Sequence, residues 1–161
     1  METIRIETWI EAPIERCFDA ARDLDLHVKS LAGTNERAVG GRMTGLIEMG
    51  ESVTWRARHF GVTQEMTSKI TAFDRPRYFQ DSMQRGAFRS FVHDHFFESC
   101  GPDIPVREPR EGYTKMLDVV VFAAPLGILG RIAETLVLRR YLDRLLRKRA
   151  EIIREAAAGT S

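Results

Sequence analysis

The spacing of hydrophobic residues predicts an early strand, two short helices, a run of strands and a long final helix. Isoleucine alternates with charged residues at the start, which indicates a strand that ends before Pro13. Pro13 suits the first turn of a helix, and apolar residues then recur at helical spacing over residues 14–21. A second short helix is expected over residues 23–31, and it should end near Gly33.

From residue 35 onward the hydrophobic pattern changes to that of strands. The expected strands are 36–39, 44–49, 51–60, 62–73, 77–84, 88–98 and 112–123. Glycine and proline separate them at short intervals, which favours an antiparallel meander because hairpins need only short turns. Residues 101–112 hold three prolines and several charges, so we expect an exposed loop there.

The last part of the sequence predicts a long helix that begins at Pro125 and carries one apolar stripe. The stripe consists of Leu129, Ile132, Leu136, Leu142, Leu145 and Ile152. Helices segregated to one side of an antiparallel sheet make an α+β fold. The helix must bury its stripe against the curved sheet, and a cavity can persist between them. We expect one domain over residues 1–155 and a frayed tail over residues 156–161.

Composition is that of an ordinary globular protein and narrows the function classes only slightly. The 161 residues are 43% hydrophobic and 29% charged, with a formal net charge of +1, which argues against a nucleic-acid-binding domain. Cys17 and Cys100 have no CxxC spacing, so we expect reduced, structural thiols. The sequence shows no signal core and no membrane-span pattern, and a cytoplasmic protein is expected.

Three stretches resemble a known superfamily. They are Val53–Gly61, Phe88–Phe97 and Asp118–Gly127. Together with the order of elements given above, they resemble the START-like, or SRPBCC, superfamily. This superfamily has the helix-grip fold and includes Bet v 1-type pollen allergens and polyketide cyclases. The resemblance is nearest to the small bacterial members and covers almost the whole chain. It implies a curved antiparallel sheet, two short helices and a long C-terminal helix, with a hydrophobic cavity between that helix and the sheet. It does not imply a reaction, because folds host unrelated functions.

The sharpest polar candidates are histidines on the expected strands. His93 and His95 are two residues apart, so they share one face and can bind a metal when another strand adds a ligand. Asp118 can supply a carboxylate or orient an imidazole, and His59 lies on a neighbouring strand. The alternative is a set of buried histidines bonded to backbone or carboxylate. We favour that alternative and expect no metal and no cofactor. The resemblance offers the pocket mouth as a position for His27, but as an isolated helix histidine it is expected at the surface.

Aromatic and methionine side chains complete the candidate cavity wall, because they give large and adaptable apolar contacts. The expected ligand-binding residues are Trp55, His59, Met66, Phe79, Met83, Phe91, His93, His95, Phe97 and Asp118. Arg56 and Arg58 alternate with this wall and should point outward. The basic run over residues 139–149 is interpreted as a solvated helix face, and contact with an anionic membrane surface is the less favoured alternative.

We therefore expect a protein that binds a small hydrophobic or amphipathic ligand, such as a lipid, an isoprenoid or a polyketide-like molecule, and that is a monomer or homodimer. The alternative is a polyketide cyclase or dehydratase that uses histidine and aspartate as acid and base. A third interpretation is an interaction protein with a collapsed cavity. Binding is favoured over catalysis because polar groups are present but no catalytic set is complete.

Overall fold

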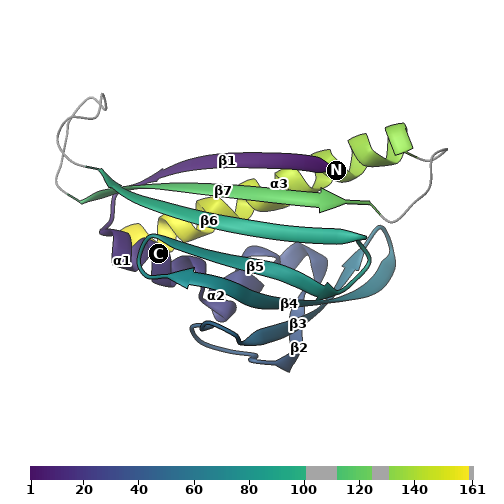
Figure 1. Cartoon of the computed structure of the whole chain (residues 1–161), viewed down its shortest axis with the longest axis horizontal. Helices are drawn as coiled ribbons and strands as arrows, with labels where there is room; N and C mark the ends of the chain where they lie inside the picture. The colour runs from purple at the N-terminus through teal and green to yellow at the C-terminus, as the bar shows by residue number, and fades with distance from the viewer. Residues whose placement is uncertain (101–111, 125–130, 160–161) are drawn as a thin grey trace.

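A computed structural model describes residues 1–100, 112–124 and 131–159 of the chain. Within these ranges seven strands form one antiparallel sheet in the order β1-β7-β6-β5-β4-β3-β2 (Figure 1). The strands are β1 (Glu2–Ile10), β2 (Arg37–Gly41), β3 (Ser52–His59), β4 (Val62–Asp74), β5 (Tyr78–Arg85), β6 (Ser90–Cys100) and β7 (Tyr113–Ala123). The helices are α1 (Ile14–Ala21), α2 (Leu24–Ser30), a 3₁₀ turn (Ala32–Thr34) and α3 (Arg131–Ala158). The α+β helix-grip layout expected from the sequence is therefore confirmed.

The strand from 44 to 49 was predicted wrongly. This segment makes only an isolated bridge between Leu46 and Asp23. Its backbone bonds instead to the junction of α1 and α2: Leu24 N donates to Gly45 O at 3.0 Å and Ile47 N donates to Arg22 O at 3.1 Å. Gly45 has a φ of +71°, which breaks an extended strand and turns the chain toward the helices. The expected loop over 101–112 lies almost wholly outside the described residues.

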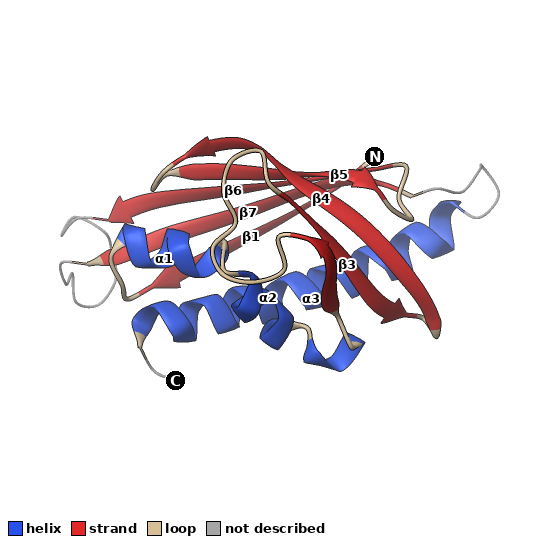
Figure 2. Ribbon diagram, turned by 90° about the horizontal axis from the view of Figure 1, so that it is seen from below, coloured by secondary structure: helices blue, strands red, loops and turns tan. Residues whose placement is uncertain are grey.

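The helices lie on the concave side of the curved sheet, as Figure 2 shows. Phe18 of α1 is fully buried and meets three aromatic rings edge-on, those of Phe73, Phe79 and Phe97, at centroid distances of 5.3, 5.4 and 5.4 Å. Asp23 caps α2 by accepting hydrogen bonds from the backbone of Asp25 and Leu26. These contacts fill the end of the concave face that lies under α1.

Helix α3 is rotated relative to the expected stripe, although Leu142 and Leu145 of that stripe do line the cavity. Leu136 is 49% exposed and Ile152 is only half-buried. The inward positions are Leu138, Leu142, Leu146, Ala150, Ile153 and Ala157, spaced three or four residues apart. The start at Pro125, residue Leu129 and the side chain of Ile132 lie outside the described residues.

The end of α3 also differs from the expectation of a tail that frays from residue 156. The helix continues to Ala158, and Ala157 is buried in the main core. Gly159, with a φ of +75°, follows it. No described helix is long and apolar enough to cross a membrane.

Candidate functional site

A cavity of about 640 Å³ lies between the concave face of the sheet and α3. Most of its wall is apolar, and the side chains come from the α1–α2 region, from β3 to β6 and from α3. The apolar lining includes Leu24, Ile47, Val53, Trp55, Ile70, Phe79, Phe91, Leu138, Leu142 and Leu146. This volume falls within the range of sites that hold small molecules.

Six of the ten side chains proposed from sequence line this cavity. They are Trp55, His59, Met66, Phe79, Phe91 and His93. The other four do not contribute to its lining. Phe97 is buried against Phe18 beneath α1, Met83 is half-buried farther along β5, and His95 and Asp118 lie deeper in the sheet.

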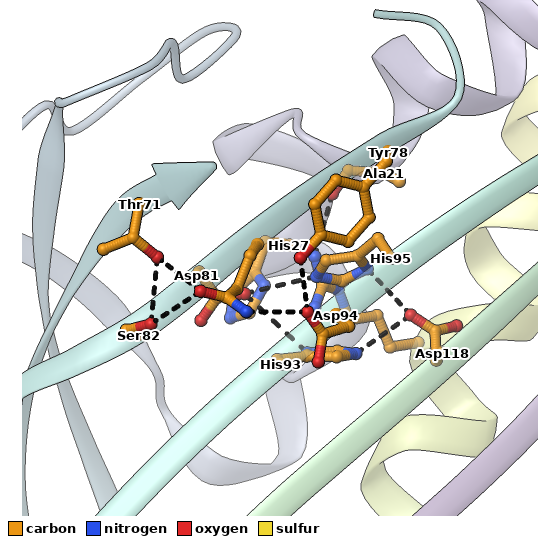
Figure 3. Close-up of polar contacts among 12 residues, drawn as sticks. Ala21, His27, Thr71, Tyr78, Asp81, Ser82, His93, Asp94, His95 and Asp118 are labelled. Carbon is orange, nitrogen blue, oxygen red and sulfur yellow. Dashed lines mark hydrogen bonds and ion pairs between the residues drawn. The ribbon is translucent and has the colours of Figure 1, made fainter. Parts of the chain in front are cut away.

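Four ionisable side chains meet on the concave face where β5, β6 and β7 run side by side (Figure 3). Register sets the arrangement, because Asp81 is paired across the strands with His93 and His95 with Asp118. Asp81 Oδ2 lies 3.2 Å from His95 Nε2 and 3.8 Å from His93 Nδ1. Asp118 Oδ1 lies 2.9 Å from His93 Nε2 and 2.8 Å from His95 Nδ1. We call these four residues the His–Asp cluster.

The hydrogen bonds of this cluster are unequal. His93 Nε2 is placed to donate to Asp118, and His95 Nε2 to Asp81. His95 Nδ1, although 2.8 Å from Asp118 Oδ1, is not directed at it as a hydrogen bond requires, so this buried nitrogen has only an electrostatic partner. The two imidazole rings lie 3.7 Å apart between centroids.

Burial and the charges of the neighbouring groups set the pKa, and so the protonation state, of each side chain in the cluster. Burial and the neighbouring charge of His95 lower the pKa of His93 to about 4, which leaves His93 neutral. Burial alone would lower the pKa of His95, but its contacts with Asp118 and Asp81 and the charge of Asp118 raise it. Burial would raise the pKa of Asp81, yet the hydrogen bond from His95 and the histidine charges lower it to about 2. The pKa of Asp118 is also lowered, by the same kinds of contact. Both carboxylates are therefore ionised.

The opposite, convex face of the same strands carries a separate set of polar contacts. Asp94 accepts hydrogen bonds from the Tyr78 hydroxyl at 2.6 Å and from Gln80 Nε2 at 2.8 Å. Burial and the bond to Asp94 raise the pKa of Tyr78 to about 12. Asp94 thus stands between the two cluster histidines in sequence but takes no part in the cavity.

Comparison with known proteins gives the fold. No protein-family model matches the sequence, and no curated protein matches it. Among solved structures, TTHA0849 from Thermus thermophilus superposes with a TM-score of 0.73 at 17% identity, covering 99% of each chain. Ara h 8.0201 gives a TM-score of 0.62 at 15% identity, covering 94% of this chain and 97% of that chain. Major latex-like protein 151 from Panax ginseng gives 0.63 at 13% identity, covering 97% of each chain. The chain has a Bet v 1/SRPBCC-type helix-grip fold.

Sequence reasoning missed one member of the cluster, Asp81. Its signal was present, because Asp81 lies between Phe79 and Met83 on a strand whose odd-numbered positions had been assigned to the cavity. What alternation could not give is the register between β5 and β6. In the register of this sheet Asp81 is paired with His93.

His27 was wrongly expected at the surface. Its side chain is 16% exposed, its Nε2 lies 2.8 Å from Glu36 Oε1, and its ring stacks on Trp55 at 4.3 Å. Burial is the main reason that the pKa of His27 is lowered. Both His27 and Glu36 line the cavity, which gives it a second polar patch.

Two further contacts join α3 to the rest of the cavity wall. Tyr141 OH lies 2.6 Å from His59 Nδ1 at the end of β3, and its ring meets Phe60 at 4.7 Å. Arg149 donates from Nη2 to the Ala21 carbonyl oxygen at 2.8 Å. Tyr141 and Arg149 were not among the residues proposed from sequence, because the run that holds them reads as a solvated basic face.

Proposed function

We propose that this protein binds one small apolar or amphipathic molecule in the cavity between the sheet and α3. The observation that carries the proposal is the cavity itself, about 640 Å³ in volume and walled mainly by leucine, isoleucine and aromatic side chains. Burial of an apolar ligand against such a wall gives affinity at about 25 cal/mol per Å², before the cost of ordering the ligand.

The polar groups on the wall indicate the kind of ligand. Asp81 and His93 reach the cavity from the sheet, and His27 with Glu36 reaches it from beside Trp55. An ionised Asp81 accepts hydrogen bonds and repels anions, so a ligand hydroxyl suits this end better than a carboxylate. We therefore favour a hydroxylated isoprenoid, lipid or polyketide-like molecule over a free fatty acid.

Recovery of a bound molecule tests the proposal directly. Protein purified without detergent is analysed by native mass spectrometry and then extracted with organic solvent. We expect an adduct of small-molecule mass, released on denaturation. If no adduct is found, binding is tested by fluorescence with the Trp9→Phe variant, which keeps Trp55 in the cavity wall as the sole tryptophan. A panel of hydroxylated apolar probes should quench Trp55, and failure of every probe at their solubility limit refutes the proposal.

A matched pair of variants locates the binding site. Ala57 is buried, lines the cavity and has a small side chain, so Ala57→Phe fills part of the space. Thr63 on β4 is exposed, so Thr63→Phe adds the same group outside. Probe affinity should fall in the first variant and stay unchanged in the second. Equal affinities in both would place binding elsewhere.

Acid–base catalysis is a second candidate, favoured by one observation: His93 lines the cavity while its Nε2 is held by Asp118. A histidine oriented by a carboxylate is the usual form of a general base. We rank this candidate second because a group with a pKa of about 4 is a weak base near neutral pH. Turnover of a ketide analogue that is abolished in His93→Ala would support catalysis; no turnover by the unaltered protein would exclude it for that substrate.

A further inference from the structure

Three donor groups on the concave face already stand at the separation of ligands around a metal ion. Among the described residues, Asp81, His93 and His95 each offer one donor atom, and these atoms lie within 4.8 Å of one another. Asp81 Oδ2 is 3.2 Å from His95 Nε2 and 3.8 Å from His93 Nδ1. Zinc bonds of roughly 2.0–2.1 Å in a tetrahedron separate neighbouring ligand atoms by about 3.4 Å. The two distances from Asp81 are therefore close to that separation, and the two histidine nitrogens would move to match it if they are farther apart.

Asp118 holds the other side of both imidazoles. Its Oδ1 lies 2.9 Å from His93 Nε2 and 2.8 Å from His95 Nδ1, the nitrogens that face away from Asp81. Histidines that bind metals usually donate their second ring N–H to a carboxylate, which fixes the tautomer. His93 Nε2 hydrogen-bonds to Asp118, and His95 Nδ1 lies beside the same oxygen; with the protons on these two nitrogens, the lone pairs of His93 Nδ1 and His95 Nε2 would face Asp81. One carboxylate thus lies beside the second ring nitrogen of both histidines and already orients His93.

The contacts of His95 are incomplete without a further partner. His95 is fully buried, and its Nδ1 lies near Asp118 without the direction of a hydrogen bond. An ion held at Nε2 would fix the ring and allow Nδ1–H to turn toward Asp118. The charge of one divalent cation would balance the negative charges of Asp81 and Asp118, while both histidines remain neutral.

The three donor groups can be reached from the cavity, and one side of the site faces it. Asp81 and His93 line the 640 Å³ cavity, whereas His95 and Asp118 lie behind them. A metal held by the three donors would therefore present its remaining coordination position to the cavity. Two arginines, Arg22 and Arg149, also line the cavity. Arg22 is paired with Asp19 and Glu48. Arg149 donates to the Ala21 carbonyl oxygen, while its charge still acts on Asp81 and His95.

We propose that Asp81, His93 and His95 form a site for a divalent transition-metal ion, with Asp118 as the carboxylate that orients both histidines. Two imidazoles and one carboxylate with an open position are the ligand set of zinc and non-haem iron(II) sites. This reverses the expectation from sequence, which had two histidines two residues apart but no third ligand. The site does not depend on the proposed apolar ligand.

Titration of metal-free, untagged protein with Co²⁺ and Zn²⁺ tests the site. We expect about one Co²⁺ per chain, visible d–d absorption without thiolate bands, and displacement by Zn²⁺. His93→Gln and Asp81→Asn should each weaken binding by more than about 100-fold, and Asp118→Asn by about 10–100-fold. Asp94→Asn, which changes a carboxylate on the convex face of the same strands, should leave the metal affinity unchanged.

Circular dichroism of each variant shows whether it is folded, and the titration of the unaltered protein stands whether or not a variant folds. Folded, metal-free protein that takes up no Co²⁺ or Zn²⁺ at about 100 μM, far above the usual range of structural zinc, overturns the proposal. Thiolate bands, or binding that survives in folded Asp81→Asn and His93→Gln, would place the ion elsewhere and also overturn it. Binding of apolar probes measured with and without chelator keeps this result separate from the proposed function.

Discussion

Replacing Asp118 by asparagine should show how strongly the buried cluster depends on its inner carboxylate. Asp118 is 5% exposed, and its Oδ1 lies 2.9 Å from His93 Nε2 and 2.8 Å from His95 Nδ1. Asparagine keeps the size but removes the charge, so His95, whose pKa is raised by its contacts with Asp118 and Asp81, loses one of its two carboxylates. Breaking a buried charged pair costs about 3–5 kcal/mol. Asp81 remains 3.2 Å from His95, so we expect the lower end, about 3 kcal/mol.

The assay is urea denaturation followed by circular dichroism in the presence of chelator, so that no metal contributes. For a chain of this size, a loss of about 3 kcal/mol in the free energy of unfolding lowers the melting temperature by roughly 6–12 °C. Asp94→Asn is the matched control, because Asp94 lies on the convex face and accepts bonds from Tyr78 and Gln80. Loss of these partly exposed bonds should cost about 1 kcal/mol. Equal losses in the two variants, or less than about 1 kcal/mol for Asp118→Asn, would refute the reasoning.

Three more predictions concern the core, the pH response and ligand exchange. Phe18→Ala should lower the free energy of unfolding by about 3–5 kcal/mol in urea, since a fully buried ring is lost from an aromatic cluster; a loss under about 1 kcal/mol would contradict the packing. Burial lowers the pKa of His27 from 6.5, so its protonation favours the unfolded chain. Stability should be level above that pH and fall below it, with a smaller fall in His27→Gln; identical profiles would contradict this. Tyr141→Phe removes the 2.6 Å contact between Tyr141 OH on α3 and His59 Nδ1 on β3, two residues that line the cavity. The rate at which a bound dye leaves the cavity, measured by stopped-flow fluorescence, should therefore rise by about 2- to 10-fold, with little change in Kd. Unchanged rates would show that this contact does not limit passage.

Alternation within strands was readable from the sequence because it depends only on the chain's own geometry. Val53, Trp55 and Ala57 are buried on one face of β3, as their period of two predicted. The same alternation placed His93 and His95 inward on β6. These are local consequences of extended backbone, and they needed no knowledge of neighbours.

Which side chains pair across neighbouring strands could not be predicted from alternation within a strand. Asp81 joins His93 because β5 and β6 pair in one register, and a shift of one residue would have turned its side chain to the convex face. Likewise the helical period of α3 was visible, but the choice of Leu138 rather than Leu136 as an inward residue depends on how the helix is rotated against the sheet. Several apolar stripes were available on that helix, and only packing selected one.

Apart from residues 44–49, the sequence by itself thus determined the order of elements, the inward face of the central strands and the α+β class, because each follows from interactions within a few residues. Tertiary structure alone decided that residues 44–49 bond to the α1–α2 junction, that His27 stacks on Trp55, and that two aspartates from different strands enclose two histidines. Those contacts join residues far apart in the chain, and their geometry is set by strand register and by the curvature that leaves a cavity under α3.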